Sequence, residues 1–163
     1  MIDQNNNDIV AKILIDIGSV KFSFNKPFIL TSGLKSPVYV DCRKIISYVN
    51  ERNTIIEYTK KYFEEKKIEF DILAGGETAG IPYAAYLSEH LQKPMIYVRK
   101  KPKGFGKNQQ IEGNIIENKK TILIEDLATD GGSKVIFIEA MRKAGLIVND
   151  IFVIFYYDIF NLK

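Results

Sequence analysis

Three short apolar runs constrain the fold of this chain more than any other feature of the sequence. They are DILAGG (71–76), MIYV (95–98) and TILIED (121–126). Because their middles do not alternate apolar with polar residues, we expect strands buried on both faces, as in a parallel sheet covered by helices. Apolar residues at helical spacing flank these runs at 55–63, 81–91 and 135–145. We therefore predict an α/β chain with a doubly wound parallel sheet, right-handed crossovers and a last strand at 151–157.

The residues before position 50 follow a different pattern. Apolar residues recur at helical spacing over residues 8–17, and Gly18 can end that helix. Residues 22–41 read as short extended pieces interrupted by prolines and a glycine. A chain of 163 residues, 46% hydrophobic and 26% charged, fits one globular domain. We expect this single domain to have two parts, a small N-terminal part at about 1–45 and a core at about 50–163.

Composition and charge exclude several classes of protein. No apolar run approaches the roughly 20 residues of a membrane helix, and the first ten residues lack the pattern of a secretory signal. The single cysteine, Cys42, cannot form an internal disulfide, and we expect it to be a small buried residue of a cytoplasmic protein. The net charge is only +3, although residues 99–107 hold five cations and no acid. Because neither a helical basic stripe nor zinc-ligand spacing accompanies this cluster, we expect no nucleic-acid partner and no membrane partner.

The segment TILIEDLATDGGSK (121–134) is the sharpest candidate site. An apolar strand delivers Glu125 and Asp126 to its carboxyl end, where ligands bind in sheets of this type. Gly131 and Gly132 allow a tight turn whose N–H groups, with the start of the next helix, can bind a phosphate. The two acids would repel a polyanion unless they accept hydrogen bonds from ribose hydroxyls or hold Mg²⁺. The pattern predicts a site for a ribose 5-phosphate, although a simple strand-to-helix turn with a capping acid would also fit it.

Together with three further segments, this site resembles the orotate phosphoribosyltransferases, a branch of the type I phosphoribosyltransferase family. The segments FILTSGLKSPVYVDCR (28–43), DILAGGETAGIP (71–82) and YVRKKPKGFGKNQQIEG (97–113) are similar to that family's substrate-binding hood, pyrophosphate loop and flexible catalytic loop. The resemblance runs from about residue 22 to about residue 157. It implies the type I fold with a small N-terminal hood at about 1–45. It also implies the Mg²⁺-dependent reaction of orotate with 5-phosphoribosyl 1-diphosphate (PRPP), which gives orotidine 5′-phosphate and pyrophosphate in pyrimidine biosynthesis.

The resemblance also implies roles for individual residues. Arg99, Lys100 and Lys103 would neutralise the leaving pyrophosphate and, with Glu125 and Asp126, form the catalytic set. PRPP would be bound by these five residues and by Thr78, Ala79, Phe105, Leu127, Ala128, Thr129, Asp130, Gly131, Gly132 and Ser133. Orotate would be bound by Thr31, Tyr39, Val40 and Thr129. Mg²⁺ would be held mainly through PRPP and water, with Asp126 as the candidate protein ligand.

In this family the loop at 99–113 reaches the neighbouring subunit's site, which implies a homodimer with shared sites. The chain departs from many relatives at Phe105, where they have a histidine, and at Ala79 and Thr31, where some have lysines. An arginine that many relatives carry after the last strand is absent at 156–158, so Arg43 and Lys44 are candidates to balance the orotate carboxylate. Relatives usually continue beyond this strand, so we expect either an incomplete C-terminus or a different finish to the sheet edge.

Two other functions stay open at this point. One is a type I relative that acts on a purine, against which the hood segment argues. The other is a non-catalytic module on the same fold that senses nucleotides or binds RNA. Fold alone does not separate the three functions. The acid pair and the cationic loop are the features that favour catalysis over a non-catalytic module.

Overall fold

The computed structural model describes residues 4–30, 32–103 and 110–160 of the chain. The chain forms two compact units, residues 1–59 and 60–163. The boundary falls inside helix α2 (Val49–Glu65), so the first unit extends beyond the predicted hood and includes most of this helix. Within the described ranges, no helix combines the length and the apolar character that a membrane crossing needs.

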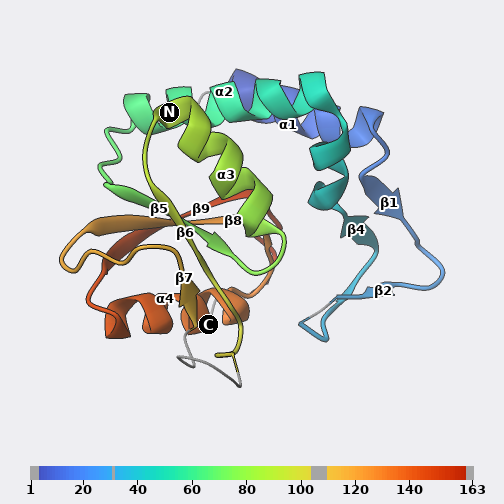
Figure 1. The fold of residues 1–163 in the computed structure, drawn as a ribbon. Coiled ribbons are helices and arrows are strands. Elements are labelled where there is room, and N and C mark those ends of the chain that lie inside the picture. The colour runs from blue at the N-terminus through green and yellow to red at the C-terminus, as the bar shows by residue number, and fades with distance from the viewer. Residues whose placement is uncertain (1–3, 31, 104–109, 161–163) are drawn as a thin grey trace. The chain divides into compact units, whose positions relative to one another are not determined.

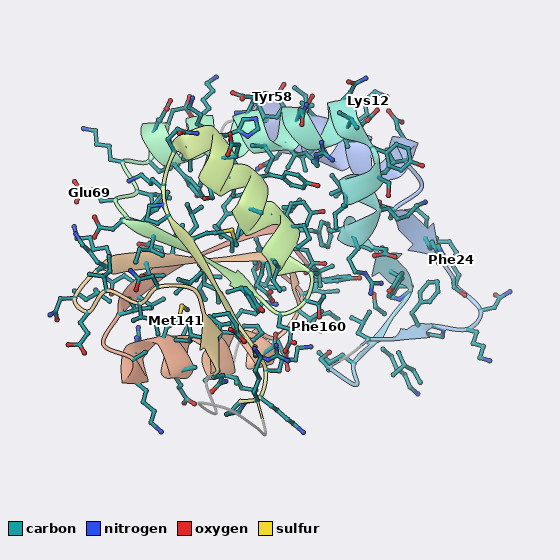
Figure 2. The ribbon with its side chains drawn as sticks, viewed as in Figure 1. Lys12, Phe24, Tyr58, Glu69, Met141 and Phe160 are labelled. Carbon is teal, nitrogen blue, oxygen red and sulfur yellow. The ribbon has the colours of Figure 1, made fainter. Side chains whose placement is uncertain are left out.

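The first unit consists of helices and two small antiparallel sheets. Its elements are α1 (Gln4–Asp16), β1 (Val20–Phe22), β2 (Phe28–Ile29), β3 (Lys35–Ser36), β4 (Val38–Val40), the 3₁₀ helix η1 (Cys42–Ser47) and the start of α2. Strand β1 pairs with β4, and β2 pairs with β3. Leu14 and Ile45 are among its buried residues, and Cys42 is completely buried, as predicted. Phe24, by contrast, is 82% exposed and projects outward (Figure 2).

Gly18 ends the first helical segment, as the sequence predicts. Its φ of +66° is a left-handed conformation that glycine adopts without steric cost, and its N–H donates to the carbonyl of Ile15 at 2.9 Å. The Lys44 ammonium donates to the carbonyls of Ile17 (2.8 Å) and Gly18 (3.0 Å). Lys44 therefore serves as a cap for the end of α1, where a cation is favourable.

The second unit is built on a five-stranded sheet in the order β7-β6-β5-β8-β9. Its strands are β5 (Ile72–Gly76), β6 (Met95–Val98), β7 (Ile111–Glu112), β8 (Lys120–Ala128) and β9 (Ile147–Tyr156). Strands β5, β6, β8 and β9 are parallel, and β7 runs antiparallel to β6 at one edge. The predicted parallel α/β sheet is thus confirmed, and every residue of β5 is buried.

Helices α3 (Gly80–Leu91) and α4 (Gly132–Lys143) cover opposite faces of this sheet (Figure 1). Phe137 and Met141 of α4 are completely buried in a cluster with Ile72, Ala74, Ile96, Val98, Leu123 and Val148 of the strands. Figure 2 shows Met141 between α4 and the sheet. At the end of α2, the Phe63 ring meets the Phe152 ring of β9 edge-on at 5.2 Å between centroids. These packed layers fix the carboxyl ends of the strands on a rigid frame.

Three boundaries differ from those predicted. Residues 100–113 do not form a loop throughout, because Ile111 and Glu112 pair with Val98 and Tyr97 as β7. Strand β8 continues past the acid pair to Ala128, and β9 begins at Ile147 rather than at 151. Both strands are longer than predicted because they pair with each other, and this pairing satisfies backbone hydrogen-bonding groups of β8 as far as Ala128. The acid pair therefore lies inside a strand, with Asp126 two residues before its end.

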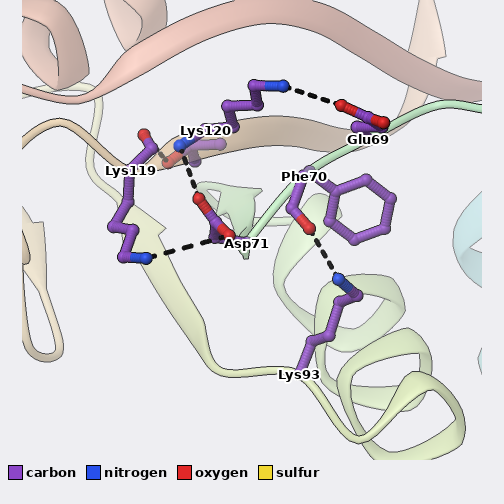
Figure 3. Close-up of polar contacts among 7 residues, drawn as sticks. Glu69, Phe70, Asp71, Lys93, Lys119 and Lys120 are labelled. Carbon is purple, nitrogen blue, oxygen red and sulfur yellow. Dashed lines mark hydrogen bonds and ion pairs between the residues drawn. The ribbon is translucent and has the colours of Figure 1, made fainter.

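The opposite, amino-terminal edge of the sheet is tied together by polar contacts (Figure 3). The Asp71 carboxylate accepts a hydrogen bond from the Lys120 N–H at 3.0 Å, and the Lys120 ammonium pairs with Glu69 at 2.8 Å. The Lys93 ammonium donates to the carbonyl of Phe70 at 2.6 Å and lies 4.9 Å from the centre of its ring. These contacts fix the start of β5 against β8 and have a structural role. Ligands in sheets of this type bind at the opposite, carboxyl edge.

Candidate active site

The carboxyl edge of the parallel strands brings together three of the segments singled out in the sequence. Gly76 lies beside Val98, and Gly75 lies beside Ile124, in the sheet register. The residues that follow these positions are therefore neighbours. They are Glu77 after β5, Arg99 after β6 and Glu125 on β8.

Glycine is required at the end of β5 (Gly76) and at the start of α3 (Gly80) because the Glu125 carboxylate lies against both residues. A Cβ on Gly76 would meet Glu125 Oε1 and would lie 2.8 Å from Phe137 Cε2. A Cβ on Gly80 would meet the carbonyl oxygen of Ile124 and would lie 2.8 Å from Glu125 Oε1. The loop therefore packs its backbone directly onto the acid, which only glycine permits.

The backbone donors of this loop are not all directed outward. The Glu77 N–H donates to the Val98 carbonyl at 2.8 Å and so belongs to the sheet pairing. The Glu77–Thr78 peptide bond is cis. Thr78 is exposed, and Ala79 is half-buried directly before α3. Within the segment that resembles the pyrophosphate loop, the Glu77 N–H is therefore used by the sheet.

A substitution tests this close approach. Gly80→Ala is expected to lower the free energy of unfolding by about 1–3 kcal/mol, because the added methyl group displaces strand backbone. Thermal unfolding measures the effect, and Ala85→Ser, a similar small addition at an exposed position of α3, is the matched control. Wild-type stability in Gly80→Ala would contradict the packing described here.

Glu125 and Asp126 have different environments. Glu125 is 5% exposed, and its Oε2 pairs with the Lys134 ammonium at 2.7 Å, whereas Asp126 is half-buried. Burial raises the pKa of the Glu125 carboxyl, the charge and the hydrogen bond of Lys134 oppose that shift, Asp126 adds to it and Lys100 opposes it. Glu125 is thus a paired, buried carboxylate, and Asp126 is the partly accessible member of the pair.

The turn after β8 forms the predicted glycine-rich bend. Gly131 has a φ of +76°, which allows the chain to turn directly into α4. The Asp130 carboxylate accepts hydrogen bonds from the Gly132 N–H at 3.2 Å and from the Thr129 hydroxyl at 3.4 Å. An acid at this place is favourable because the helix N-terminus carries partial positive charge. Leu127, Thr129 and Ser133 are half-buried, and Ala128 is buried.

The cationic segment after β6 is held by two acids, Glu77 and Glu112, that were not among the predicted site residues. The Lys100 N–H donates to Glu77 Oε2 at 2.9 Å, and the Arg99 guanidinium lies 3.8 Å from Glu77 Oε1. Arg99 also lies 3.9 Å from Glu112 Oε1, and the Lys103 ammonium pairs with the same oxygen. Glu112 is brought there by the antiparallel pairing of β7 with β6. No local sequence pattern identifies Glu112, because its position depends on the pairing of β7 with β6. Phe105 lies outside the described residues.

The residues predicted to bind orotate lie in the first unit, apart from Thr129. Val40 is 5% exposed and pairs with Val20 across the β1–β4 sheet. The Tyr39 ring lies 5.5 Å from the Phe28 ring, and its hydroxyl accepts a hydrogen bond from Arg43 at 3.2 Å. Thr31 lies outside the described residues. Arg43 also pairs with Asp41 at 2.7 Å, which fixes its guanidinium beside Tyr39.

A protein-built metal centre is not found among the residues that the structure describes. No group of three or more histidine, cysteine, aspartate or glutamate side chains there could hold a metal ion. The half-buried Asp126 carboxylate is a hard oxygen donor of the kind that Mg²⁺ prefers. A cation carried mainly by phosphate oxygens and water, with a single carboxylate beside it, fits this donor set.

Comparisons with known proteins agree with this geometry. The family model for the phosphoribosyl transferase domain matches residues 47–156. The orotate phosphoribosyltransferase of Rhizobium rhizogenes is 51% identical over 155 residues, which cover 94% of this chain and 67% of that protein. The corresponding protein of Ruegeria sp. is 50% identical over 152 residues, which cover 92% of this chain and 67% of that protein.

Among solved structures, the orotate phosphoribosyltransferase of Aeropyrum pernix superposes with a TM-score of 0.77 at 26% identity, covering 91% of this chain and 94% of that one. The fold and the sequence identity point to the same family as the glycine-rich loop, the cationic segment and the acid pair, which follow one another in that order along the chain. The chain belongs to the orotate phosphoribosyltransferase family.

Proposed function

We propose that this chain transfers the 5-phosphoribosyl group of PRPP to orotate and releases pyrophosphate. One ring nitrogen of orotate gives up its proton to solvent and forms a bond to the anomeric carbon as the bond from that carbon to the pyrophosphate oxygen breaks. The observation that carries the proposal is the meeting of the cationic segment 99–103, the acid pair and the glycine-rich loop at one edge of the sheet. Membership of the family supports it.

The two ends of PRPP have matching groups in the second unit. We assign the 5-phosphate to the turn at 129–133, where the N-terminus of α4 provides a favourable dipole and N–H groups other than that of Gly132, which donates to Asp130. We assign the pyrophosphate to the loop at 75–80 and to Arg99, Lys100 and Lys103. The leaving pyrophosphate gains negative charge in the transition state, so cations placed beside it accelerate the reaction.

Asp126 is the protein group that we assign to the ribose. Its carboxylate accepts hydrogen bonds from the ribose hydroxyls or binds the Mg²⁺ that accompanies PRPP. Mg²⁺, when bound, neutralises charge on the pyrophosphate and orients it. The oxygens of Glu125 face Lys134 and the backbone of the glycine-rich loop. We therefore assign Glu125 the role of holding this loop and β8 in place beside Asp126.

The remaining assignments extend the family resemblance to this chain. We propose that Thr31, Tyr39, Val40 and Thr129 each contact orotate, and Arg43 beside Tyr39 is a cation available to its carboxylate. We also propose a cytoplasmic homodimer in which the loop at 99–113 is shared across the interface, so that its cations serve the sites of both subunits. Sedimentation of the purified protein, with and without PRPP, tests the dimer.

A spectroscopic assay tests the proposed reaction. Purified protein is mixed with orotate, PRPP and Mg²⁺, and the ultraviolet absorbance of orotate is followed. Loss of that absorbance, dependent on PRPP and on Mg²⁺, is expected. Turnover of a purine base without turnover of orotate would reassign the base, and tight binding of RNA without any turnover would contradict catalysis.

A further inference from the structure

Lys134 is a buried cation that the proposed reaction leaves unassigned. It is 8% exposed, and its ammonium has three oxygen neighbours: Glu125 Oε2 at 2.7 Å, the carbonyl oxygen of Leu127 at 2.6 Å and Ser133 Oγ at 3.4 Å. Lysine is almost never buried to this degree without such partners. The ammonium therefore has an acceptor for each of its three protons.

Local helix energetics do not explain this lysine. Lys134 is the third residue of α4, and a cation in the first turn opposes the helix dipole. Lys143, at the other end of the same helix, is exposed and occupies the place where a cation is favourable. The position of Lys134 is accounted for by its tertiary partners on β8 rather than by the helix that carries it.

The partners of Lys134 belong to both ends of the proposed PRPP site. Glu125 connects it to the pyrophosphate loop, because the other carboxylate oxygen of Glu125 faces Gly76 and Gly80. Leu127 and Ser133 connect it to the two ends of the 5-phosphate turn, where β8 finishes and α4 begins. The Lys134 ammonium thus contacts the 5-phosphate turn directly and the pyrophosphate loop through Glu125. In the proposed function, these two sites bind the two ends of one PRPP molecule.

We propose that Lys134 is a positioning residue that sets the spacing between the pyrophosphate loop (75–80) and the 5-phosphate turn (129–133), so that both ends of PRPP bind at once. The proposal rests on the proposed function for its ligand. Lys134 itself touches no substrate. Lys134 affects the simultaneous binding of the 5-phosphate and the pyrophosphate of PRPP. A small displacement of one phosphate site relative to the other weakens the binding of the whole molecule.

Binding measurements on Lys134→Met test the spacing. Dissociation constants are measured by calorimetry, in the presence of Mg²⁺, for PRPP, for ribose 5-phosphate and for pyrophosphate. We expect PRPP binding to weaken by about thirtyfold or more and each fragment by about threefold or less. The loss for PRPP then exceeds the product of the two fragment losses, which simple loss of charge or of folded protein would not produce.

Two further variants keep the test decisive. Lys143→Met removes a cation from the exposed end of α4 and should leave all three dissociation constants unchanged. If Lys134→Met does not fold, Lys134→Arg keeps the positive charge beside Glu125 but changes the donor geometry. It should retain the wild-type melting temperature while still weakening PRPP more than the combined fragments.

The outcomes separate this inference from the proposed function. A PRPP loss equal to or below the product of the fragment losses would overturn the positioning role. Wild-type protein that binds PRPP but does not consume orotate would contradict only the base assignment, because none of these ligands contains the base. Wild-type protein that fails to bind PRPP would overturn both.

Discussion

Asp126→Asn is expected to lower kcat/KM for PRPP by about 10²–10³-fold, with little change in the melting temperature. Asparagine matches aspartate in size but has no charge. It therefore accepts weaker hydrogen bonds from ribose hydroxyls and is a poorer ligand for Mg²⁺. Because Asp126 is half-buried whereas Glu125 is buried and paired with Lys134, the effect on turnover should exceed the effect on folding.

Steady-state kinetics with PRPP as the varied substrate measure this effect. Asp150→Asn makes the same chemical change at an exposed position of β9 and is the control. Wild-type kinetics in Asp126→Asn would remove Asp126 from the ribose site and leave the acid pair with a structural role only.

Lys103→Ala is expected to lower kcat by about 10²–10³-fold while the melting temperature stays close to that of the wild type. In the described structure Lys103 pairs with Glu112, and its side chain is 37% exposed. Pairs of this exposure contribute at most about 1 kcal/mol, so their loss has little effect on folding. The role that we propose for the cation is to neutralise the negative charge that grows on the leaving pyrophosphate.

Lys101→Ala distinguishes a specific lysine from the general charge of the segment. Lys101 is exposed and lies two residues before Lys103. If both variants lose kcat equally, the segment acts through its total charge. A large loss of stability in Lys103→Ala with normal turnover would contradict its catalytic role.

Much of the second unit follows from residue pattern alone. The apolar runs at 71–76, 95–98 and 121–126 all became parallel strands, because a strand without polar alternation is stable only when both faces are covered. Gly18 and Gly131 marked backbone turns with positive φ, since other residues adopt that conformation at a cost. These are local properties, legible from a few neighbouring residues.

The pairing of side chains did not follow from local pattern. Ile111-Glu112 looks like the end of a polar loop, and only its pairing with β6 places Glu112 beside Arg99 and Lys103. In the same way, β8 extends to Ala128 because β9 runs beside it. Each result depends on a partner distant in the sequence.

Residue types and their order along the chain thus specified the α/β class, the glycine turns and the chemical groups of the site. The tertiary structure gives two adjacent acids, Glu125 and Asp126, different environments. It buried Glu125 against Lys134 and the glycine-rich loop, and it left Asp126 partly accessible. The reason is that burial and ion pairing depend on which elements pack together, and a change of neighbour alters the free energy of a charge far more than a change of position along the chain does.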